Sequence, residues 1–320
     1  MAAQVVSFIN LKGGVGKSTL ALAIGEALAF LAPRDRVLLV DIDLQSNLSY
    51  ATTSADRIKE LEGAGRTVYN MFAQALEGKS WDLRSSINRE CSNIVRNTHL
   101  HNLVCSPALG ELDEDMLTML ENGTKLNVSF REILKGHLDQ VRDDYDYIFI
   151  DCPPSLSPVT SNAIVASDYF VVPLIPEELS LQGIELIQNR IAMLQSAFPY
   201  VKIDFLGSIL NKVDIRRRWD HLRLAEDVAT RSASRYRPFD YWVGDWKPLY
   251  TVTDFGYFRS EGLANGWPSW GRKYGRSTRR TNPNDETGGQ HIIWPTGEAK
   301  TFYIRRRLLG LVNEFIGRLP

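Results

Sequence analysis

The sequence is poor in cysteine, and its three cysteines are too scattered to build a disulfide framework or a zinc site. Cys91, Cys105 and Cys152 are odd in number, and no two of them have CxxC spacing. This usage is typical of reduced thiols in an intracellular protein. The sequence also lacks an apolar run of the ~18–20 residues that a bilayer-spanning helix needs. The first expected strand begins at Val5, which leaves no room for a signal peptide, so we expect a soluble, cytoplasmic protein.

The chain has almost no net charge. Its 37 lysines and arginines against 38 aspartates and glutamates give a formal charge of −1 at pH 7. A balance of this kind provides no overall attraction to nucleic acid or to an anionic membrane, so any such binding must come from a local basic patch. What the chain does have is length and apolar content. With 320 residues, 44% of them hydrophobic, it can bury a substantial core.

The most informative motif is Lys-Gly-Gly-Val-Gly-Lys-Ser-Thr at residues 12–19, between the apolar run Val5–Ile9 and a helix-compatible run from Leu20 to Phe30. A strand, a glycine-rich turn and a helix in this order predict a phosphate-binding loop, in which backbone N–H groups and the helix N-terminus surround a polyphosphate. The residues expected to bind nucleotide are Gly13, Gly14, Val15, Gly16, Lys17, Ser18 and Thr19. Lys17 would contact the β- and γ-phosphates, and the Ser18 hydroxyl would ligate Mg²⁺. The general pattern has glycine at position 11; here that residue is Leu11, and Lys12 heads the loop.

Acidic residues follow two further apolar runs. Asp41 and Asp43 come at the end of Val37–Val40, and Asp151 follows Tyr147–Ile150. Strand ends of a parallel sheet meet at its carboxyl edge, where open α/β sheets bind ligands. A carboxylate there can orient or deprotonate the water that attacks a γ-phosphate, and another can hold Mg²⁺ through a water. The alternative for each is a turn-forming aspartate.

Strands and helices alternate along the chain, which predicts an α/β fold with a doubly wound, mostly parallel sheet flanked by helices. The expected strands are Val5–Ile9, Arg36–Asp41, Asn102–Ser106, Asp146–Ile150, Tyr169–Leu174 and Ile203–Asn211. The expected helices are Ser18–Leu31, Asn127–Asp143, Pro158–Ala166 and Leu181–Ala197. The polar stretch Thr52–His99 is expected to form short helices outside the sheet.

Together these motifs resemble the ParA/MinD family, the deviant Walker A subset of P-loop ATPases, over about residues 1–215. Residues 41–47, Asp-Ile-Asp-Leu-Gln-Ser-Asn, resemble the family motif DxDPQGN, and residues 147–155 resemble its Walker B strand and switch. The resemblance implies ATP and Mg²⁺ as cofactors, with Ser18 and Asp151 on the metal side. It further implies that Lys12 reaches the nucleotide of a partner subunit, and that Asp43 acts in hydrolysis with support from Asp41.

What the resemblance implies for function is an ATP-dependent homodimer that binds nonspecific DNA and positions a plasmid, a chromosome or another cargo. Hydrolysis would be slow and stimulated by a ParB-like partner, and the ATP-bound protein would be associated with the nucleoid. Two alternatives stay open: a MinD-like ATPase that cycles on a membrane, and a nucleotide-dependent scaffold that does not bind DNA.

Residues 211–214, Asn-Lys-Val-Asp, leave the choice of base open. They match the NKxD spelling with which many GTPases read guanine, but four residues at a strand end also suit a turn. The resemblance implies instead that Asn211 contacts adenine. We expect ATP, because the longer match outweighs the short motif.

The C-terminal third has no counterpart in the resemblance. Residues 239–300 hold five of the seven tryptophans, and a basic stretch within them contains Arg272, Lys273, Arg276, Arg279 and Arg280. Aromatic residues interleaved with arginine suit nucleic acid, a protein partner or packing onto the core, and the sequence does not decide among them. We expect an ATPase domain over residues 1–238, a Trp/Arg-rich insertion or lobe over 239–300, and a terminal helix over 301–320.

Two arginine triplets complete the basic features. Arg216, Arg217 and Arg218 follow the last expected strand and are, by position, the better candidates for DNA contact; a solvated loop is the alternative. Arg305–Arg307 lie on the terminal helix, whose apolar stripe includes Leu308, Leu311, Val312 and Phe315. Such a stripe either packs on the sheet or anchors the protein to a membrane.

Overall fold

A computed structural model describes residues 2–31, 35–91, 99–122, 131–175, 179–213, 237–243 and 298–320. Within these ranges, the centre of the fold is a six-stranded sheet in the order β3-β2-β4-β1-β5-β6, in which every pair of neighbours is parallel. The strands are β1 (Gln4–Phe8), β2 (Val37–Asp41), β3 (Leu100–Leu103), β4 (Tyr147–Asp151), β5 (Tyr169–Leu174) and β6 (Asp204–Leu210). The sheet confirms the expected doubly wound α/β class.

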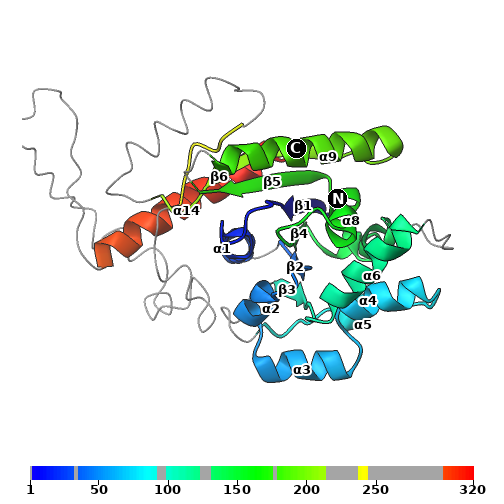
Figure 1. The fold of residues 1–320 in the computed structure, drawn as a ribbon. Coiled ribbons are helices and arrows are strands. Elements are labelled where there is room, and N and C mark those ends of the chain that lie inside the picture. Colours follow the sequence, from blue (N-terminus) through cyan, green and yellow to red (C-terminus); the bar gives the residue numbers. More distant parts are fainter. Residues whose placement is uncertain are drawn as a thin grey trace, which may run out of the picture.

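Helices connect the strands and cover both faces of the sheet (Figure 1). They are α1 (Lys17–Leu31), α2 (Asn47–Thr52), α3 (Ala55–Gly63), α4 (Val68–Leu76), α5 (Leu83–Ser86), α6 (Leu109–Glu121), α7 (Ile133–Leu138), α8 (Pro158–Ala166), α9 (Leu179–Ala197) and α14 (Glu298–Arg318), with a 3₁₀ turn at Arg142–Asp144. In the part of the chain that is described, each helix is too short or too polar to cross a bilayer.

Alternate strand residues build two separate cores, because successive side chains of a strand point to opposite faces. Val5 and Ile148 pack with residues of α4, α6, α7, α8 and α9 on one face. Val6 and Phe149 pack with α1 and α14 on the other. Since both faces are covered, the strands are apolar almost throughout, as is usual for parallel sheets.

The segment 237–243 extends the sheet beyond β6. Phe239 N donates to Ser208 O (2.9 Å), and Val243 N donates to Leu210 O (2.8 Å). Helix α14 holds this segment in place: the Glu314 carboxylate accepts from the backbone N–H groups of residues 240 and 241, and the Arg318 guanidinium lies 3.8 Å from the Phe239 ring centroid. Residues 237–243 therefore pack against β6 and α14.

The apolar stripe of α14 is buried against α1 and the sheet. Leu308, Leu311, Val312 and Phe315 are each at most 4% exposed, and the Phe315 ring lies 5.6 Å from the ring of Phe149 on β4. The terminal helix thus contributes to the core.

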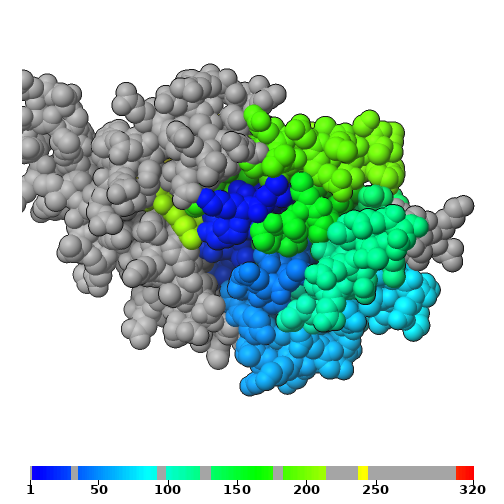
Figure 2. Space-filling model, viewed as in Figure 1, coloured from blue at the N-terminus to red at the C-terminus, as the bar shows by residue number. Residues whose placement is uncertain are grey.

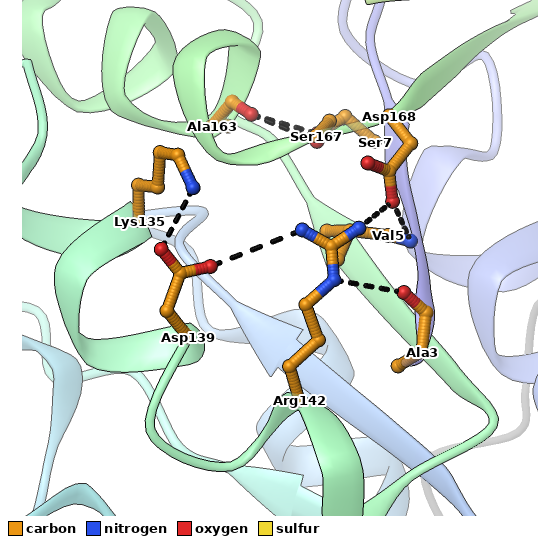
Figure 3. A network of polar contacts seen from close by, with 9 residues as sticks. All are labelled: Ala3, Val5, Ser7, Lys135, Asp139, Arg142, Ala163, Ser167 and Asp168. Carbon is orange, nitrogen blue, oxygen red and sulfur yellow. Dashed lines mark hydrogen bonds and ion pairs between the residues drawn. The ribbon is translucent and has the colours of Figure 1, made fainter. Parts of the chain in front are cut away.

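The amino edge of the sheet carries a polar network centred on Arg142 (Figure 3). Its Nε donates to Ala3 O (3.0 Å), and its guanidinium pairs with Asp168, which also accepts from Val5 N (2.9 Å). Asp139 lies 3.8 Å from the same guanidinium and bonds Lys135 at 2.7 Å. Polar groups at this edge are therefore hydrogen-bonded or paired within the protein.

Two helices of the structure differ from what the sequence predicted. The helix expected over Asn127–Asp143 is formed only at α7 in the described residues, and turn-type hydrogen bonds from Gln140 N to His137 O and from Val141 N to Leu138 O end it before the 3₁₀ turn. This early end brings Arg142 to the sheet. Helix α6 was not expected from the sequence at all.

Candidate functional site

The site lies at the carboxyl edge of the sheet, where four strands deliver the motif residues. Because β1 and β4 are neighbours, the glycine-rich loop after β1 lies beside Asp151 at the end of β4. Strand β2 adds Asp41 and Asp43 on the other side of β4. In the space-filling view, dark blue residues from the start of the chain lie next to green residues from its middle and lighter blue residues that follow β2 (Figure 2).

The loop has the backbone conformation that its glycines permit. Gly14 and Gly16 take φ values of 73° and 93°, in the left-handed region that favours glycine. A Cβ at Gly16 would lie 2.1 Å from Asn211 Nδ2, so no other residue fits there without displacing Asn211. Helix α1 begins directly afterwards at Lys17, so its unpaired N–H groups and its dipole face the loop. This arrangement is a ready-made anion site.

Asn10 fixes the head of the loop, and the sequence patterns did not single it out. Its side chain is 1% exposed; Nδ2 donates to Pro173 O on β5 (2.6 Å), and Oδ1 accepts from Lys12 N (2.8 Å). The side chain of Lys12 itself is half-buried. The signal that could have identified Asn10 is a polar residue directly between the apolar run Val5–Ile9 and the glycine-rich loop.

Asn211, at the end of β6, closes over the loop from the far side. Its Nδ2 donates to Val15 O (2.9 Å), and its backbone N donates to Leu174 O (2.7 Å). The residue is fully buried, and its Oδ1 has no hydrogen-bond partner among the described residues. Asn211 therefore offers a buried acceptor beside the phosphate loop.

Asp151 is the most unusual group of the site. It is fully buried, and neither carboxylate oxygen has a hydrogen-bond partner in the part of the chain that is described. Burial raises the pKa of Asp151 well above its ordinary value, and the carboxylates of Asp41 and Asp43 raise it further, while the neighbouring Ser18 hydroxyl and Lys17 ammonium lower it. A buried carboxyl group without partners is costly unless a cation or donor completes it.

Asp41 faces Asp151 across the β2–β4 pair but is well supplied with donors. Its Oδ1 accepts from Asp43 N (3.1 Å), and its Oδ2 accepts from both N and Oγ of Ser49 (2.7 Å each). Burial raises the pKa of Asp41 to about 7, the Ser49 bonds oppose the shift, and the Asp43 carboxylate adds to it. Since both oxygens of Asp41 are engaged, its geometry suits support of the loop that carries Asp43.

Asp43 lies just beyond the strand and is 6% exposed. Its Oδ1 accepts from Gln45 N (3.0 Å), and its backbone oxygen accepts from Ser46 N (2.8 Å), so the carboxylate sits in a tight turn after β2. The turn brings it to the same edge as Lys17 and Asp151.

The structure brings together the loop, Lys17, Ser18, the three aspartates and Asn211. The arginines expected to contact DNA are a different matter. Arg216, Arg217, Arg218, Arg272, Lys273, Arg276, Arg279 and Arg280 lie outside the described residues. The expected role of these eight residues stays a prediction.

Comparison with known proteins agrees with this geometry. A family model described as an AAA domain matches residues 3–203. The chain is similar to the chromosome-partitioning ATPase Soj of Treponema pallidum (strain Nichols), with 34% identity over 266 residues, or 83% of this chain and 88% of that protein. It is also similar to the sporulation initiation inhibitor protein Soj of Bacillus subtilis (strain 168), with 31% identity over 67% of this chain and 74% of that protein.

A solved structure shares the fold. The putative plasmid partition protein of Borrelia burgdorferi B31, bound to AMPPNP, aligns over 100% of both chains with a TM-score of 0.62 and 19% identity. At 19% identity this structural match shows only a shared fold. The family assignment rests on the family model and on the two sequence relatives. On these grounds the chain belongs to the ParA family of P-loop partition ATPases.

Proposed function

We propose that this protein binds and hydrolyses ATP and works as an ATP-dependent dimerisation switch in the partition or positioning of DNA or another cargo. The observation that carries the proposal is the fully buried, unpartnered carboxylate of Asp151 beside Lys17 and Ser18, at the edge of the sheet where the glycine loop meets α1. A site of this kind is incomplete until a cation and an anion enter together.

The residues present fit Mg²⁺. Carboxylate and hydroxyl oxygens are the ligands this ion prefers, and the ion retains several waters, so a carboxylate and a hydroxyl suffice on the protein side. Asp151 would hold it through water and Ser18 directly. When bound, Mg²⁺ supplies neutralisation of the charge on the β- and γ-phosphates.

Hydrolysis then depends on position and charge. Backbone N–H groups of the loop would bind the phosphates, and Lys17, 5% exposed, places its positive charge near Asp151. Asp43 would orient the attacking water and accept its proton as the water oxygen bonds to the γ-phosphorus, while the bond from that phosphorus to the bridging oxygen breaks and ADP leaves. Asp41 keeps the Asp43 turn in place through Asp43 N.

Asn211 supports ATP over GTP. Its Nδ2 is committed to Val15 O, so Oδ1 is the atom it can offer to a base. An acceptor suits the exocyclic amino group of adenine and opposes the carbonyl oxygen that guanine presents on the same edge. The Asp214 that would read guanine lies outside the described residues.

The steps beyond nucleotide binding follow the relatives, whose names describe chromosome partitioning and plasmid partition. Lys12, anchored by Asn10, would reach the phosphates of a second subunit and couple ATP to dimer formation. The dimer would bind nonspecific DNA in the nucleoid through basic residues, and a ParB-like partner would stimulate slow hydrolysis and release it. Between cycles the protein would be free in the cytoplasm.

The packing of α14 weighs against a membrane anchor. The apolar residues of its second half are buried against α1 and β4, so they are not available to a bilayer unless the helix detaches from the core. A membrane-cycling ATPase is therefore the weaker proposal.

The experiment that tests the proposal measures retention of purified protein on nonspecific DNA with ATP, with ADP and without nucleotide, over a salt series. We expect retention only with ATP, weakening steeply with salt because phosphate contacts release counterions. Retention that ignores the nucleotide would remove the switch from the proposal. Vesicle binding that requires ATP, in place of DNA binding, would favour the membrane cycle.

A further inference from the structure

Ser49 connects two strand ends through a single hydroxyl group. It lies in α2 and is 1% exposed. Its Oγ donates to Asp41 Oδ2 (2.7 Å) and accepts from Cys105 N, just past β3 (2.9 Å). Its backbone N donates to the same Asp41 oxygen (2.7 Å). Ser49 thus joins α2 and the residue beyond β3 to the carboxylate that ends β2.

The connection continues to the hydrolytic carboxylate. Asp41 Oδ1 accepts from Asp43 N (3.1 Å), so one end of the Asp41 carboxylate holds the Asp43 turn while the other end is held by Ser49. The orientation of Asp41 therefore fixes where the backbone of Asp43 lies. A rotation of the Asp41 carboxylate would move Asp43 away from its place opposite the loop.

The neighbouring Asp151 carboxyl group favours rotation of the Asp41 carboxylate away from it. Asp151 is its register partner on the neighbouring strand, and both are buried. Two carboxylates in such a setting repel each other. The hydroxyl and the backbone N of Ser49 both hold Asp41 Oδ2 on the α2 side, while Asp151 is the carboxyl group next to Ser18 and Lys17.

We propose that Ser49 is a positioning residue for ATP hydrolysis: through Asp41 it sets the location of Asp43 relative to the γ-phosphate. The inference rests on the proposed ATPase function and on Asp43 as its hydrolytic residue. It assigns no contact between Ser49 and the nucleotide.

The test compares Ser49→Ala with Thr52→Val. Thr52 is a fully buried hydroxyl of the same helix; its Oγ1 donates to Leu48 O (2.8 Å) and to the backbone oxygen of Ser49 (3.1 Å), and it accepts from Asn102 Nδ2 (2.7 Å). Among the described residues its hydroxyl makes no bond to Asp41. Both variants remove one buried hydroxyl, so both lower the melting temperature. Only Ser49→Ala removes a bond to Asp41.

We expect Ser49→Ala to lower kcat about 10–100-fold, as displacement of a reacting group by up to ~1 Å does. Its KM for Mg²⁺–ATP should stay close to that of the wild type, since the phosphate loop is untouched. Thr52→Val should keep the wild-type kcat. Ser49→Thr, which restores the hydroxyl, should recover most of kcat even where its extra methyl group lowers the melting temperature.

Equal kcat for Ser49→Ala, Thr52→Val and wild type, with Asp43→Ala inactive, would overturn the proposal and leave Ser49 a structural residue. A parallel loss of kcat in Ser49→Ala and Thr52→Val would also overturn it, because a general weakening of α2 would then explain the effect. Full activity of Asp43→Ala would remove the proposed function itself, and the role of Ser49 with it.

Discussion

The two edges of the sheet differ in whether their polar side chains have hydrogen-bond partners within the protein. At the amino edge, Arg142 bonds Ala3 O and pairs with Asp168, which also accepts from Val5 N (Figure 3). At the carboxyl edge, Asp151 and the Oδ1 of Asn211 are buried without hydrogen-bond partners in the described chain. The same residue type, aspartate at a strand end, is completed by the protein in one place and left incomplete in the other.

The difference separates stability from function. A polar group that is hydrogen-bonded within the protein stabilises the fold, as the partly exposed Arg142 and Asp168 do, whereas a buried polar group without a partner lowers stability and marks a place for a ligand. At the amino edge, the bonds of Arg142 and Asp168 join the starts of β1 and β5 to the turn before β4. The carboxyl edge keeps binding capacity for a cation and a nucleotide.

The largest expected effect is on the rate of ATP hydrolysis, from a substitution at the carboxyl edge that leaves the fold intact. Asp43→Ala should reduce ATP hydrolysis about 10²–10⁴-fold, the usual contribution of a general base. Its carboxylate accepts one described backbone bond, from Gln45 N, so the melting temperature should change little. Steady-state phosphate release together with thermal melting measures both. Wild-type turnover by this variant would contradict the assignment of Asp43.

At the amino edge we expect the reverse pattern. Asp168→Asn should lower the free energy of unfolding by about 2 kcal/mol, because it weakens the pairing with Arg142 and the bond from Val5 N. Its kcat should equal that of the wild type. Denaturant unfolding gives the first quantity, and Lys135→Met, which removes a half-exposed pair with Asp139, is the matched control with a change within ~0.5 kcal/mol. A lower kcat in correctly folded Asp168→Asn would contradict the claim that the amino edge contributes to stability and not to catalysis.

The same substitution at the carboxyl edge should have the opposite sign. Asp151→Asn exchanges an unpartnered buried carboxyl group for a neutral amide, and we expect it to raise the free energy of unfolding without nucleotide by about 1–2 kcal/mol. It should also lose the stabilisation that Mg²⁺–ATP gives the wild type. Thermal melting with and without Mg²⁺–ATP checks both. Destabilisation of the nucleotide-free variant would mean that Asp151 is a structural group like Asp168.

The smallest effect is a pH dependence at the amino edge. His101 Nδ1 lies 2.8 Å from Tyr145 Oη, and burial lowers the pKa of His101 to about 4, with positive charge on Arg89 acting in the same direction. The unfolded chain takes up this proton near pH 6.5, so the contribution of neutral His101 is complete above that pH and is lost as pH falls toward 4. Relative to His101→Gln, the wild type should lose stability on the order of 1 kcal/mol between pH 7 and pH 5. Parallel pH profiles for the two proteins would contradict this.

Much of the fold was readable from the sequence because each local pattern agreed with the others. The apolar runs before Asp41 and Asp151 are β2 and β4, and the helix expected at Pro158–Ala166 is α8 with the same bounds. The strand expected at Asn102–Ser106 is β3 at Leu100–Leu103, shifted because pairing with β2 decides the register. Helix α6 was missed because its many acidic residues weaken the apolar signal.

The site was readable in part, for a related reason. Glycines and Lys17 in one contiguous motif identify the loop, because phosphate binding requires those types at that spacing. Sequence patterns assigned no role to Asn10 or Ser49, because their bonds to Pro173 O and from Cys105 N join residues that are distant in sequence. A hydroxyl or amide that bonds a backbone leaves no periodic pattern.

The measurement that tests the central claim most directly is a calorimetric titration of the wild type with ATP, with Mg²⁺ present and with Mg²⁺ removed by chelation. If Asp151 is left incomplete in order to bind a metal-associated nucleotide, tight ATP binding should require Mg²⁺, and Asp151→Asn should bind as weakly with the ion as the wild type does without it. Equal affinity with and without Mg²⁺, unchanged in Asp151→Asn, would contradict the claim that the carboxyl edge is an open site for Mg²⁺ and ATP.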